Sequence, residues 1–337
     1  MKNTSIVDVA KRAGVSITTV SRIINNVSYP VSDEKRKRVL KAIEKLHYSP
    51  NKAAQQLKRR FTDIIGLIVR DISDPYFGGI AKGVTERASQ LGYLSLVCST
   101  GRNPEDELRY HDMLWQHRVK GIILAGGGLD QLDYKQKLSK QLARHDKYGL
   151  KIVALAPQGM EVPYVMIDDY EAGRSITEYL IQRGHRNICF ISGPQKVYTS
   201  IERLKGYRDA MDCAGIGFSM ERIGYSDFTR RGGYDACKVL LSKVKNMTAI
   251  CGANDNIAVG AMSAVKEQGL TIPEDISFIS IGDLTEAMYA DPPLTTLSIP
   301  RYEIGMLAVD AIVEGRDSIA VIVDTKIIER RSVKTLQ

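Results

Sequence analysis

Residues 5–24 read SIVDVAKRAGVSITTVSRII, and this stretch predicts two short helices joined by a tight turn. Ser5 can cap the first helix, and Gly14 is a typical helix-stop signal. Ser16 can then cap the second helix. A third helix is expected from near Ser32, where two acids follow in the first turn. Two helices joined by a tight turn and steadied by a third form the helix-turn-helix arrangement.

The start of the second predicted helix carries side chains that suit a polar partner better than water. Ile17, Thr18 and Thr19 stand at its first positions, and Arg22 lies beside its apolar stripe. An isoleucine next to hydroxyls is a poor choice for a helix face that meets only solvent. The pattern therefore indicates that this face contacts a structured polar partner.

The positive charge of the chain is concentrated at its N-terminal end. The 337 residues carry a formal net charge of +8. Residues 1–60 hold 14 Lys and Arg against 4 Asp and Glu, a net of +10, so the rest of the chain carries a net of −2. A segment this basic is either a solvated face or a module that binds a polyanion, and charge alone favours the second only modestly.

The sequence shows no signal for membrane insertion, secretion or familiar enzyme chemistry. No apolar run approaches the ~20 residues that span a bilayer, and the N-terminus has no continuous apolar region. Five scattered cysteines without a CxxC pair fit a reduced cytosolic protein. GK[ST], GxGxxG, HExxH and GxSxG motifs are absent. We therefore expect no catalytic site, no metal ion and no cofactor, although an α/β enzyme whose carboxylates meet in space stays an alternative.

From residue 62 onward, apolar β-branched runs alternate with amphipathic helical stretches. Strands are expected at 64–70, 93–99, 121–127, 151–156, 187–193, 248–252 and 276–282. Helices are expected at 78–91, 105–117, 170–183, 201–214 and 255–268. This alternation predicts parallel sheets covered by helices on both faces, and the length favours two α/β lobes. Val162-Pro163 is the expected crossover between the lobes, and ligands are expected beyond the carboxyl ends of the strands.

Two N-terminal blocks resemble the LacI/GalR family of bacterial transcription repressors: IVDVAKRAGVSITTVSRIINN (6–26) and SDEKRKRVLKAIEKLHYSPNKAAQQLKRR (32–60). The resemblance continues in order through IIGLIVRDISDPYF (64–77), RLKGYRDAM (203–211), ANDNIAVGAM (253–262) and PPLTTL (292–297). It covers nearly the whole chain, and its N-terminal block is the most specific part.

The resemblance implies a fold and domain boundaries. A helix-turn-helix head would occupy 4–48, a hinge 49–61, and a core similar to periplasmic sugar-binding proteins 62–337. The expected fold class is an all-α head joined to an α/β two-lobed core with two parallel doubly wound sheets. The N-lobe would hold about 62–161 plus 292–320, and the C-lobe about 163–291 plus 321–337.

The resemblance also implies that the second helix of the head enters the major groove of DNA. Ile17 and Thr18 can pack on a thymine methyl group, and Arg22 can bind guanine O6 and N7 in bidentate fashion. The other polar residues of the helix suit phosphate or sugar contacts, which fix register. The expected DNA-binding residues of the head are Ser16, Ile17, Thr18, Thr19, Ser21, Arg22 and Asn25.

The hinge supplies the second set of expected DNA contacts. Family members insert a hinge leucine into the minor groove at the operator centre, and Leu57 matches it. A homodimer on a palindromic double-stranded operator is implied, because two heads must meet a near-symmetric site. The expected hinge contacts are Asn51, Lys52, Ala54, Leu57 and Lys58.

For the ligand between the lobes, the resemblance points to residues that follow strands. Arg203 would hold ligand hydroxyls or carboxylates, and Phe228 would lie under a ring. One departure concerns two adjacent acids that the family usually shows after strand 276–282: the first falls on Gly282, and only Asp283 remains. A sugar or sugar derivative is the expected effector, and an oligosaccharide, a sugar phosphate or a nucleobase stays open. The expected effector-binding residues are Asp74, Tyr76, Phe77, Arg203, Phe228, Asn254, Asp255 and Asp283.

These observations predict a sequence-specific DNA-binding regulator, in the first place a repressor, whose operator affinity a small ligand controls allosterically. We expect it in the bacterial cytoplasm, at the nucleoid, with no membrane partner. One alternative is a solute-binding transport component with the same core, which needs a signal peptide or lipid anchor and should lack the basic head. Another is a co-repressor or activator that responds to a nucleobase.

Overall fold

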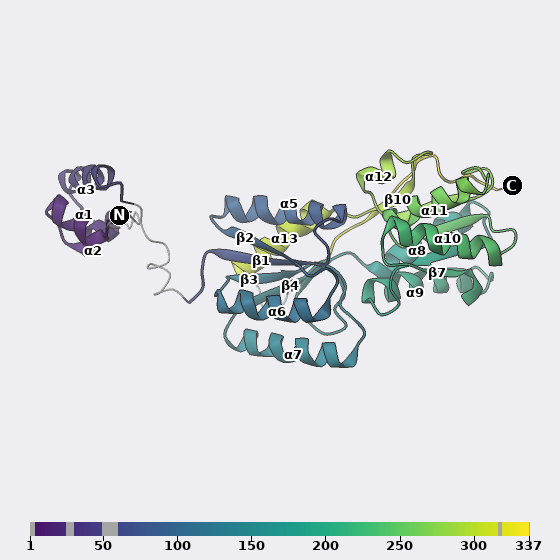
Figure 1. The fold of residues 1–337 in the computed structure, drawn as a ribbon, viewed down its shortest axis with the longest axis horizontal. Coiled ribbons are helices and arrows are strands. Elements are labelled where there is room, and N and C mark those ends of the chain that lie inside the picture. Colours follow the sequence, from purple (N-terminus) through teal and green to yellow (C-terminus); the bar gives the residue numbers. More distant parts are fainter. Residues whose placement is uncertain (1–3, 25–29, 49–59, 316–318, 337) are drawn as a thin grey trace. The chain divides into compact units, whose positions relative to one another are not determined.

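The computed structural model describes residues 4–24, 30–48, 60–315 and 319–336. It divides the chain into two compact units, a head at 1–61 and a core at 62–337 (Figure 1). The helices of the head are α1 (Ile6–Ala13), α2 (Ile17–Ile24) and α3 (Asp33–Lys45).

Local capping signals set the ends of α1 as predicted. The Ser5 hydroxyl accepts a hydrogen bond from the Asp8 backbone N–H at 3.4 Å, and the Asp8 carboxylate accepts one from the Ser5 N–H at 2.9 Å. This reciprocal pair is a capping box. Gly14 ends the helix with φ 64°, a left-handed conformation that glycine adopts without strain. Ser32 precedes α3, but its side chain makes no capping hydrogen bond.

The three helices of the head share one small core. Val9, Val20 and Val39, one from each helix, are fully buried there. Small and medium apolar side chains complete this core: Ala10, Ala13, Ile23 and Ala42. Because Val20 and Ile23 face inward, the other side of α2 is free to carry polar side chains outward.

The core contains two six-stranded sheets, one in each lobe. The N-lobe sheet has the order β11-β5-β4-β3-β1-β2, and the C-lobe sheet β12-β10-β9-β8-β6-β7. All strand pairs are parallel except β10 with β12. The N-lobe strands are β1 (Ile64–Val69), β2 (Leu94–Ser99), β3 (Gly121–Leu124), β4 (Lys151–Ala154), β5 (Tyr164–Met166) and β11 (Ala320–Ile322). The C-lobe strands are β6 (Ile188–Ser192), β7 (Ile223–Tyr225), β8 (Ala249–Gly252), β9 (Ser277–Gly282), β10 (Thr295–Ser298) and β12 (Lys326–Ile328).

Helix pairs cover both faces of each sheet. In the N-lobe, α5 packs on α13 and α6 on α7, on opposite sides of the sheet (Figure 1). In the C-lobe, α8 pairs with α9 and α10 with α11. The bounds are α5 (Pro75–Gln90), α6 (Pro104–Gln116), α7 (Leu132–Lys147), α8 (Asp169–Gln182), α9 (Tyr198–Cys213), α10 (Arg230–Lys243), α11 (Asp255–Glu267), α12 (Thr285–Met288) and α13 (Arg301–Glu314).

A glycine allows α5 and α13 to approach backbone to backbone. A Cβ atom on Gly83 would lie 2.1 Å from the carbonyl oxygen of Tyr302, far inside van der Waals contact. Any larger residue at position 83 would therefore push the two helices apart.

The chain passes between the lobes three times, which corrects the predicted lobe boundaries. It crosses after β5, after β10 and after β11. The first crossing thus follows Met166 and not Val162-Pro163, because β5 pairs with β4 and β11 in the N-lobe sheet. Strand β10 lies in the C-lobe sheet although 292–320 was assigned to the N-lobe, and β11 lies in the N-lobe sheet although 321–337 was assigned to the C-lobe.

The seven expected strands and five expected helices of the core are confirmed, each within three residues at either end. The short strands β5, β7, β10, β11 and β12 and the helices α7, α10, α12 and α13 were not predicted. Among the residues with assigned structure, no helix is long and apolar enough to cross a bilayer.

Candidate functional site

The start of α2 presents apolar and polar side chains together. The Ser16 hydroxyl accepts a hydrogen bond from the Thr19 N–H at 3.2 Å and lies 2.9 Å from the Thr19 hydroxyl, so Ser16 caps the helix as predicted. Ile17 is 47% exposed and Thr18 is exposed. Arg22 is half-buried, one turn after Thr18 on the same side of the helix. The surface therefore combines a methyl group, a hydroxyl and a guanidinium within six consecutive residues, Ile17 to Arg22.

The remaining predicted DNA contacts divide into one described residue and several that are not described. Ser21 is half-buried on α2. Outside the described residues lie Asn25, Asn51, Lys52, Ala54, Leu57 and Lys58.

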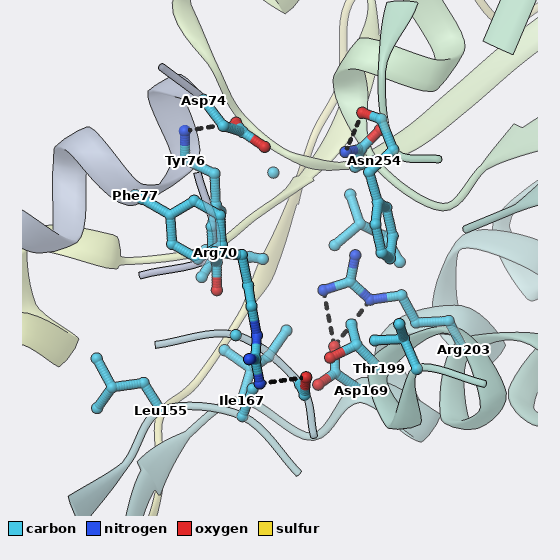
Figure 2. A pocket seen from close by; sticks show the side chains of 18 of the residues that line it. Arg70, Asp74, Tyr76, Phe77, Leu155, Ile167, Asp169, Thr199, Arg203 and Asn254 are labelled. Atoms are coloured by element: carbon cyan, nitrogen blue, oxygen red, sulfur yellow. Dashed lines mark hydrogen bonds and ion pairs between the residues drawn. The ribbon is translucent and has the colours of Figure 1, made fainter. Parts of the chain in front are cut away.

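In the core, a cavity of about 200 Å³ lies where strands of both sheets end (Figure 2). Residues that directly follow β1, β4, β5 and β10 line it, as expected for ligand sites of parallel sheets. Six predicted effector-binding residues line this cavity: Asp74, Tyr76, Phe77, Arg203, Phe228 and Asn254. Much of the remaining wall is apolar, with Leu129, Leu155, Ile167, Val197, Ile281 and Ile299.

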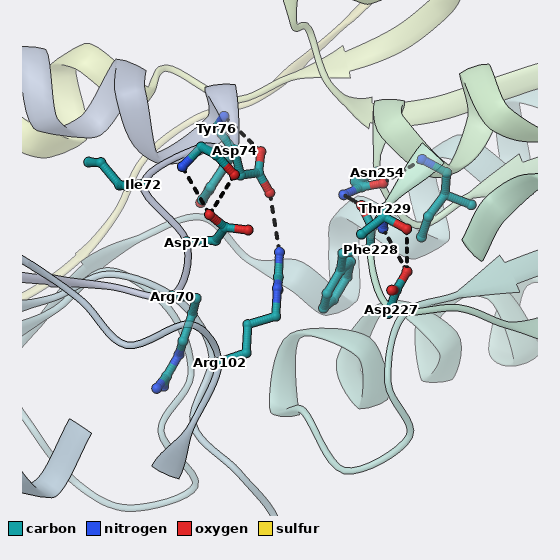
Figure 3. A network of polar contacts seen from close by, with 12 residues as sticks. Arg70, Asp71, Ile72, Asp74, Tyr76, Arg102, Asp227, Phe228, Thr229 and Asn254 are labelled. Atoms are coloured by element: carbon teal, nitrogen blue, oxygen red, sulfur yellow. Dashed lines mark hydrogen bonds and ion pairs between the residues drawn. The ribbon is translucent and has the colours of Figure 1, made fainter. Parts of the chain in front are cut away.

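Aromatic side chains reach the cavity from both lobes: Tyr76 and Phe77 from the N-lobe, and Phe228 from the C-lobe. Tyr76 lies in the first turn of α5, and Phe228 follows β7 with φ 70°, a strained left-handed conformation for a bulky residue (Figure 3). The Asn254 side-chain amide donates to the Phe228 carbonyl at 3.2 Å and helps to hold that backbone in place. Burial raises the pKa of Tyr76 to about 12, so its hydroxyl stays neutral and can donate a hydrogen bond.

A buried ion pair supplies charge on the C-lobe side of the cavity. Arg203 is 5% exposed and Asp169 is 4% exposed. The Arg203 Nε and Nη2 atoms lie 2.8 and 2.7 Å from Asp169 Oδ1 (Figure 2). Burial raises the pKa of Asp169, and the Arg203 charge opposes this shift. Arg203 was predicted, but Asp169 was not, because the pair joins the start of α8 to the second turn of α9, 34 positions apart in the sequence.

A second buried network supports the N-lobe side. Arg70 forms an ion pair with Glu107, whose carboxylate also accepts a hydrogen bond from the Tyr134 hydroxyl at 2.6 Å. Another Arg70 nitrogen donates to the Gly127 carbonyl at 2.8 Å. Sequence reasoning missed Arg70, although its position directly after β1 is the signal that could have identified it.

At a further part of the cavity wall, Arg102 links the two lobes. Its guanidinium lies 3.4 Å from the Asp74 carboxylate and 5.6 Å from the centroid of the Phe228 ring (Figure 3). The second contact is a cation–π interaction. Burial raises the pKa of Asp74, which the neighbouring Arg102 counteracts. The side chains of one lobe therefore contact the aromatic wall of the other.

Two predicted effector residues lie elsewhere, and their assignment is corrected. Asp255 is fully buried, and its carboxylate accepts hydrogen bonds from the Ser280 hydroxyl, the Thr296 hydroxyl and the Leu284 N–H at 2.5, 2.7 and 2.6 Å. Asp283 lies 2.6 Å from an Arg330 nitrogen. Neither side chain lines the cavity, because each is engaged by residues of the C-lobe itself.

Backbone pairing closes one side of the cavity across the lobes. Leu129 and Val197, which both line the cavity, form an isolated antiparallel β-bridge. Beside it, the Tyr198 hydroxyl donates to Asp130 at 2.9 Å and accepts from Lys135 at 2.8 Å. The lobes are therefore joined at this edge by a backbone bridge and by polar side-chain contacts.

No group of three or more His, Cys, Asp and Glu residues that could hold a metal ion is found among the described residues. The geometry instead joins a small helical module with an exposed reading face to a bilobal core with a ligand-sized cavity. This combination defines a ligand-responsive transcription regulator.

Comparison with known proteins places the chain in a family. Residues 5–51 match the model for bacterial regulatory proteins of the lacI family, and residues 62–331 match the model for periplasmic binding proteins and the sugar binding domain of the LacI family. The chain belongs to the LacI family of bacterial regulatory proteins. It is a DNA-binding transcriptional regulator and not an enzyme, as the sequence predicted.

Similar proteins agree along nearly the full length. HTH-type transcriptional regulator DegA of Bacillus subtilis (strain 168) is 36% identical over 302 residues, which is 90% of this chain and 88% of the relative. HTH-type transcriptional repressor PurR of Histophilus somni (strain 129Pt) is 33% identical, with 98% of this chain and 99% of the relative covered. A crystal structure of the Lac repressor dimer bound to operator and the anti-inducer ONPF has a TM-score of 0.89 at 25% identity, with 99% and 100% covered. A transcriptional regulator CelR–cellobiose complex has a TM-score of 0.72 at 31% identity, with 98% and 99% covered.

Proposed function

We propose that the chain represses transcription as a homodimer on a palindromic operator, and that a small ligand in the core cavity changes its operator affinity. It would act in the bacterial cytoplasm, on DNA of the nucleoid. The observation that carries the proposal is the exposed pair Ile17 and Thr18 at the start of α2, within a segment of net charge +10. If Ile17 and Thr18 faced only water, apolar surface would be exposed with no favourable contact. The major groove of DNA instead offers thymine methyl groups and hydrogen-bond partners to these side chains.

The residue to test first is Arg22, one turn after Thr18. Replacing Arg22 with Ala should cost about 1–3 kcal/mol of binding free energy at one base position in each half-site. The measurement is a titration of operator variants that differ at single positions. Lys243→Ala, which removes one positive charge from α10 of the core, is the control and should leave the base preference unchanged. If Arg22→Ala shows the same affinity and preference as the parent chain, the assignment is wrong.

The electrostatic part of binding has its own test. Operator affinity should fall steeply as salt rises, because Lys and Arg side chains displace counterions from phosphates. A core fragment of residues 62–337, which forms its own compact unit, should lose operator binding. A fragment that binds as tightly as the full chain would contradict a DNA-binding head.

The hinge role rests on the family resemblance, since its residues lie outside the described ones. Leu57 would enter the minor groove at the operator centre, with Asn51, Lys52, Ala54 and Lys58 near the backbone. Unstacking one base step costs a few kcal/mol, which contacts to the bent DNA offset. Leu57→Ala should therefore weaken binding to a flexible central step and reduce DNA bending in a gel-shift phasing assay.

For the effector, the cavity chemistry supports a ring compound that has both apolar faces and polar groups. Tyr76 and Phe228 provide aromatic faces, and the Arg203–Asp169 pair and Thr199 provide donors and acceptors. A sugar or sugar derivative fits this mixture, since its C–H faces pack on aromatic rings and its hydroxyls need polar partners. The CelR complex similar to this chain contains cellobiose.

A nucleobase is the second candidate. The observation that favours it is the engagement of Asp255 and Asp283 by residues of the C-lobe, which removes two carboxylates that sugar hydroxyls would use. A flat base between Tyr76 and Phe228 needs fewer hydrogen-bond partners.

A thermal-shift screen separates these candidates. Sugars, sugar phosphates and purines are tested against the full chain and against Phe228→Ala. A true effector raises the melting temperature through a stabilisation of RT ln(1 + [L]/Kd), about 2.7 kcal/mol at a concentration of 100 Kd. The shift should be smaller in Phe228→Ala. A compound that stabilises both proteins equally does not bind in this cavity.

Coupling between cavity and operator requires that the ligand prefers one arrangement of the lobes. The contacts that differ between arrangements would be those at the Leu129–Val197 bridge and at Arg102. Operator titrations with and without the ligand from the screen give both the sign and the size of the coupling.

The edge of the N-lobe sheet supports the homodimer. Strand β2 is an edge strand, and Leu94, Leu96 and Val97 on it are 70%, 41% and 40% exposed. Leucines exposed along an unpaired edge mark an interaction site. Leu96→Lys should shift the chain from dimer to monomer in sedimentation and weaken binding to palindromic DNA. A parent chain that sediments as a monomer and still binds a palindrome would refute the proposal.

A further inference from the structure

The C-lobe has a second cavity that the effector site does not use. It has a volume of about 470 Å³ and lies beside α9 and the edge strand β7. We name it the outer groove, and its main lining residues are Ser192, Ser200, Leu204, Lys205, Arg208 and Tyr225.

Two serine hydroxyls in the outer groove are buried without a partner. Ser192 and Ser200 are each 1% exposed, and neither Oγ atom has a hydrogen-bond partner among the described residues. A buried hydroxyl that leaves water without a new partner costs free energy. Both hydroxyls lie behind neighbouring atoms of the groove wall, so a bound molecule reaches them only when one of these side chains shifts.

The rim of the outer groove is positively charged. Lys205 and Arg208 lie one turn apart on α9, and both are exposed. The Arg208 Nε atom lies 3.4 Å from Asp209, and the Lys205 Nζ atom lies 5.3 Å from the centroid of the Tyr170 ring. None of the described residues that line the groove is acidic. This arrangement favours an anionic group on the ligand.

The groove also has apolar and aromatic lining residues. Leu204 comes from α9, Phe218 and Met220 from the segment before β7, and Tyr225 from β7 itself. Met220 is 58% exposed, which is high for a methionine that faces a cavity. A ring packed on these side chains would remove apolar surface from water.

We propose that the outer groove is a second ligand site, which binds a small ring compound carrying a phosphate group. The phosphate lies between Lys205 and Arg208, and the ring packs on Phe218 and Tyr225. Hydroxyl or phosphate oxygens of the ligand reach Ser200. Lys and Arg are the side chains that commonly recognise phosphate, and Arg can do so through two parallel hydrogen bonds.

The second site shares a wall with the effector cavity. From the last residue of β6 to the first turn of α9, Pro194, Val197 and Thr199 line the effector cavity, and Ser192 and Ser200 line the outer groove. This segment is tightly packed, since a Cβ atom on Gly193 would lie 2.3 Å from the Phe228 ring and 2.6 Å from Ser200 Oγ. A ligand that moves Ser200 therefore acts next to the backbone of Gly193, which packs against the Phe228 ring of the effector cavity.

Phenyl phosphate is the probe for this site, because it is a small compound that carries both a ring and a phosphate. Its binding to the full chain is measured by saturation-transfer NMR and calorimetry, without DNA. Phenol and inorganic phosphate serve as the ring-only and anion-only arms and should each bind more weakly. The double variant Lys205→Glu/Arg208→Glu should weaken phenyl phosphate binding by at least about tenfold, since it replaces attraction by repulsion.

The matched control is Lys243→Glu/Lys245→Glu, which makes the same change in net charge at exposed positions outside the groove. It should bind phenyl phosphate like the parent chain. The proposal is overturned if the full chain shows no saturable binding, or if both double variants lose affinity equally. It is also overturned if Phe228→Ala abolishes binding while Lys205→Glu/Arg208→Glu does not, because the probe would then occupy the effector cavity.

Discussion

The buried pair Arg203–Asp169 allows a quantitative test of how the cavity wall is held. Arg203→Met keeps most of the side-chain volume but removes the charge, and Asp169 is then left 4% exposed without its counter-ion. Two contacts of 2.8 and 2.7 Å to one carboxylate oxygen are lost. Removing one partner of a buried ion pair typically costs about 3–5 kcal/mol of unfolding free energy. For a core of this size, the melting temperature should fall by roughly 10 °C.

The pH dependence of this loss follows from the sign of the Asp169 shift. Burial already raises the pKa of Asp169, and the loss of Arg203 removes the charge that opposes this shift. In the variant the folded state therefore binds this proton more tightly than the unfolded state does. At low pH the Asp169 carboxyl group is neutral, so Arg203→Met loses little unfolding free energy relative to the parent chain. This deficit grows as pH rises through the raised pKa of Asp169, because the buried carboxyl group must then ionise without a counter-ion. Thermal unfolding at pH 5 and pH 8 should show the larger deficit at pH 8.

Two variants control for other causes. Adding Asp169→Asn removes the stranded charge, so the double variant should be more stable than Arg203→Met alone. Arg231→Met breaks an exposed ion pair with the same 2.8 Å separation, Arg231–Asp235. It should lower the unfolding free energy by only a small fraction of the decrease expected for Arg203→Met. The reasoning is refuted if Arg203→Met loses less than about 1 kcal/mol, or if its deficit is equal at both pH values.

Further predictions concern helix packing, helix capping and the contacts between the lobes beside the Leu129–Val197 bridge. Gly83→Ala should lower the melting temperature because its Cβ would meet the backbone of α13, whereas Gly78→Ala in the same helix, with nothing within 4 Å, should stabilise by about 0.4–1 kcal/mol. Equal effects at both positions would contradict the close approach. Ser5→Ala removes the capping box of α1 and should cost the head about 0.5–2 kcal/mol, measured by thermal unfolding of the helical signal. Tyr198→Phe should speed hydrogen exchange at the Asp130 amide. Exchange at the parent rate would show that the contacts between the lobes at this edge do not depend on the Tyr198 hydroxyl.

Local signals explain why the head was predictable. Ser5 and Gly14 act through hydrogen bonds and backbone conformation within a few residues, so the sequence contains the whole cause. The long buried strands were predictable for a similar reason, since runs such as 64–69 are apolar over their length. Strands β5 and β11 have only three residues each, and they exist because they pair with each other, which no local pattern reveals.

The cavity residues also divide into those that the sequence could predict and those that it could not. Tyr76 and Asn254 could be placed because they follow strands whose ends meet at one edge. Asp255 occupies an equivalent position in the sequence, but the Ser280 and Thr296 hydroxyls from β9 and β10 turn its carboxylate into a structural acceptor. Which polar side chain faces a ligand therefore depends on partners that only the folded chain brings together.

The late position of β11 has a consequence for synthesis on the ribosome. The N-lobe sheet begins at residue 64 but gains its β11 edge only when residues 320–322 have left the exit tunnel. At about 5–20 residues per second, the nascent lobe waits on the order of ten seconds or more with β5 unpaired on one side. An early stop codon before position 320 would thus leave a product with an open strand for chaperones and proteases to recognise.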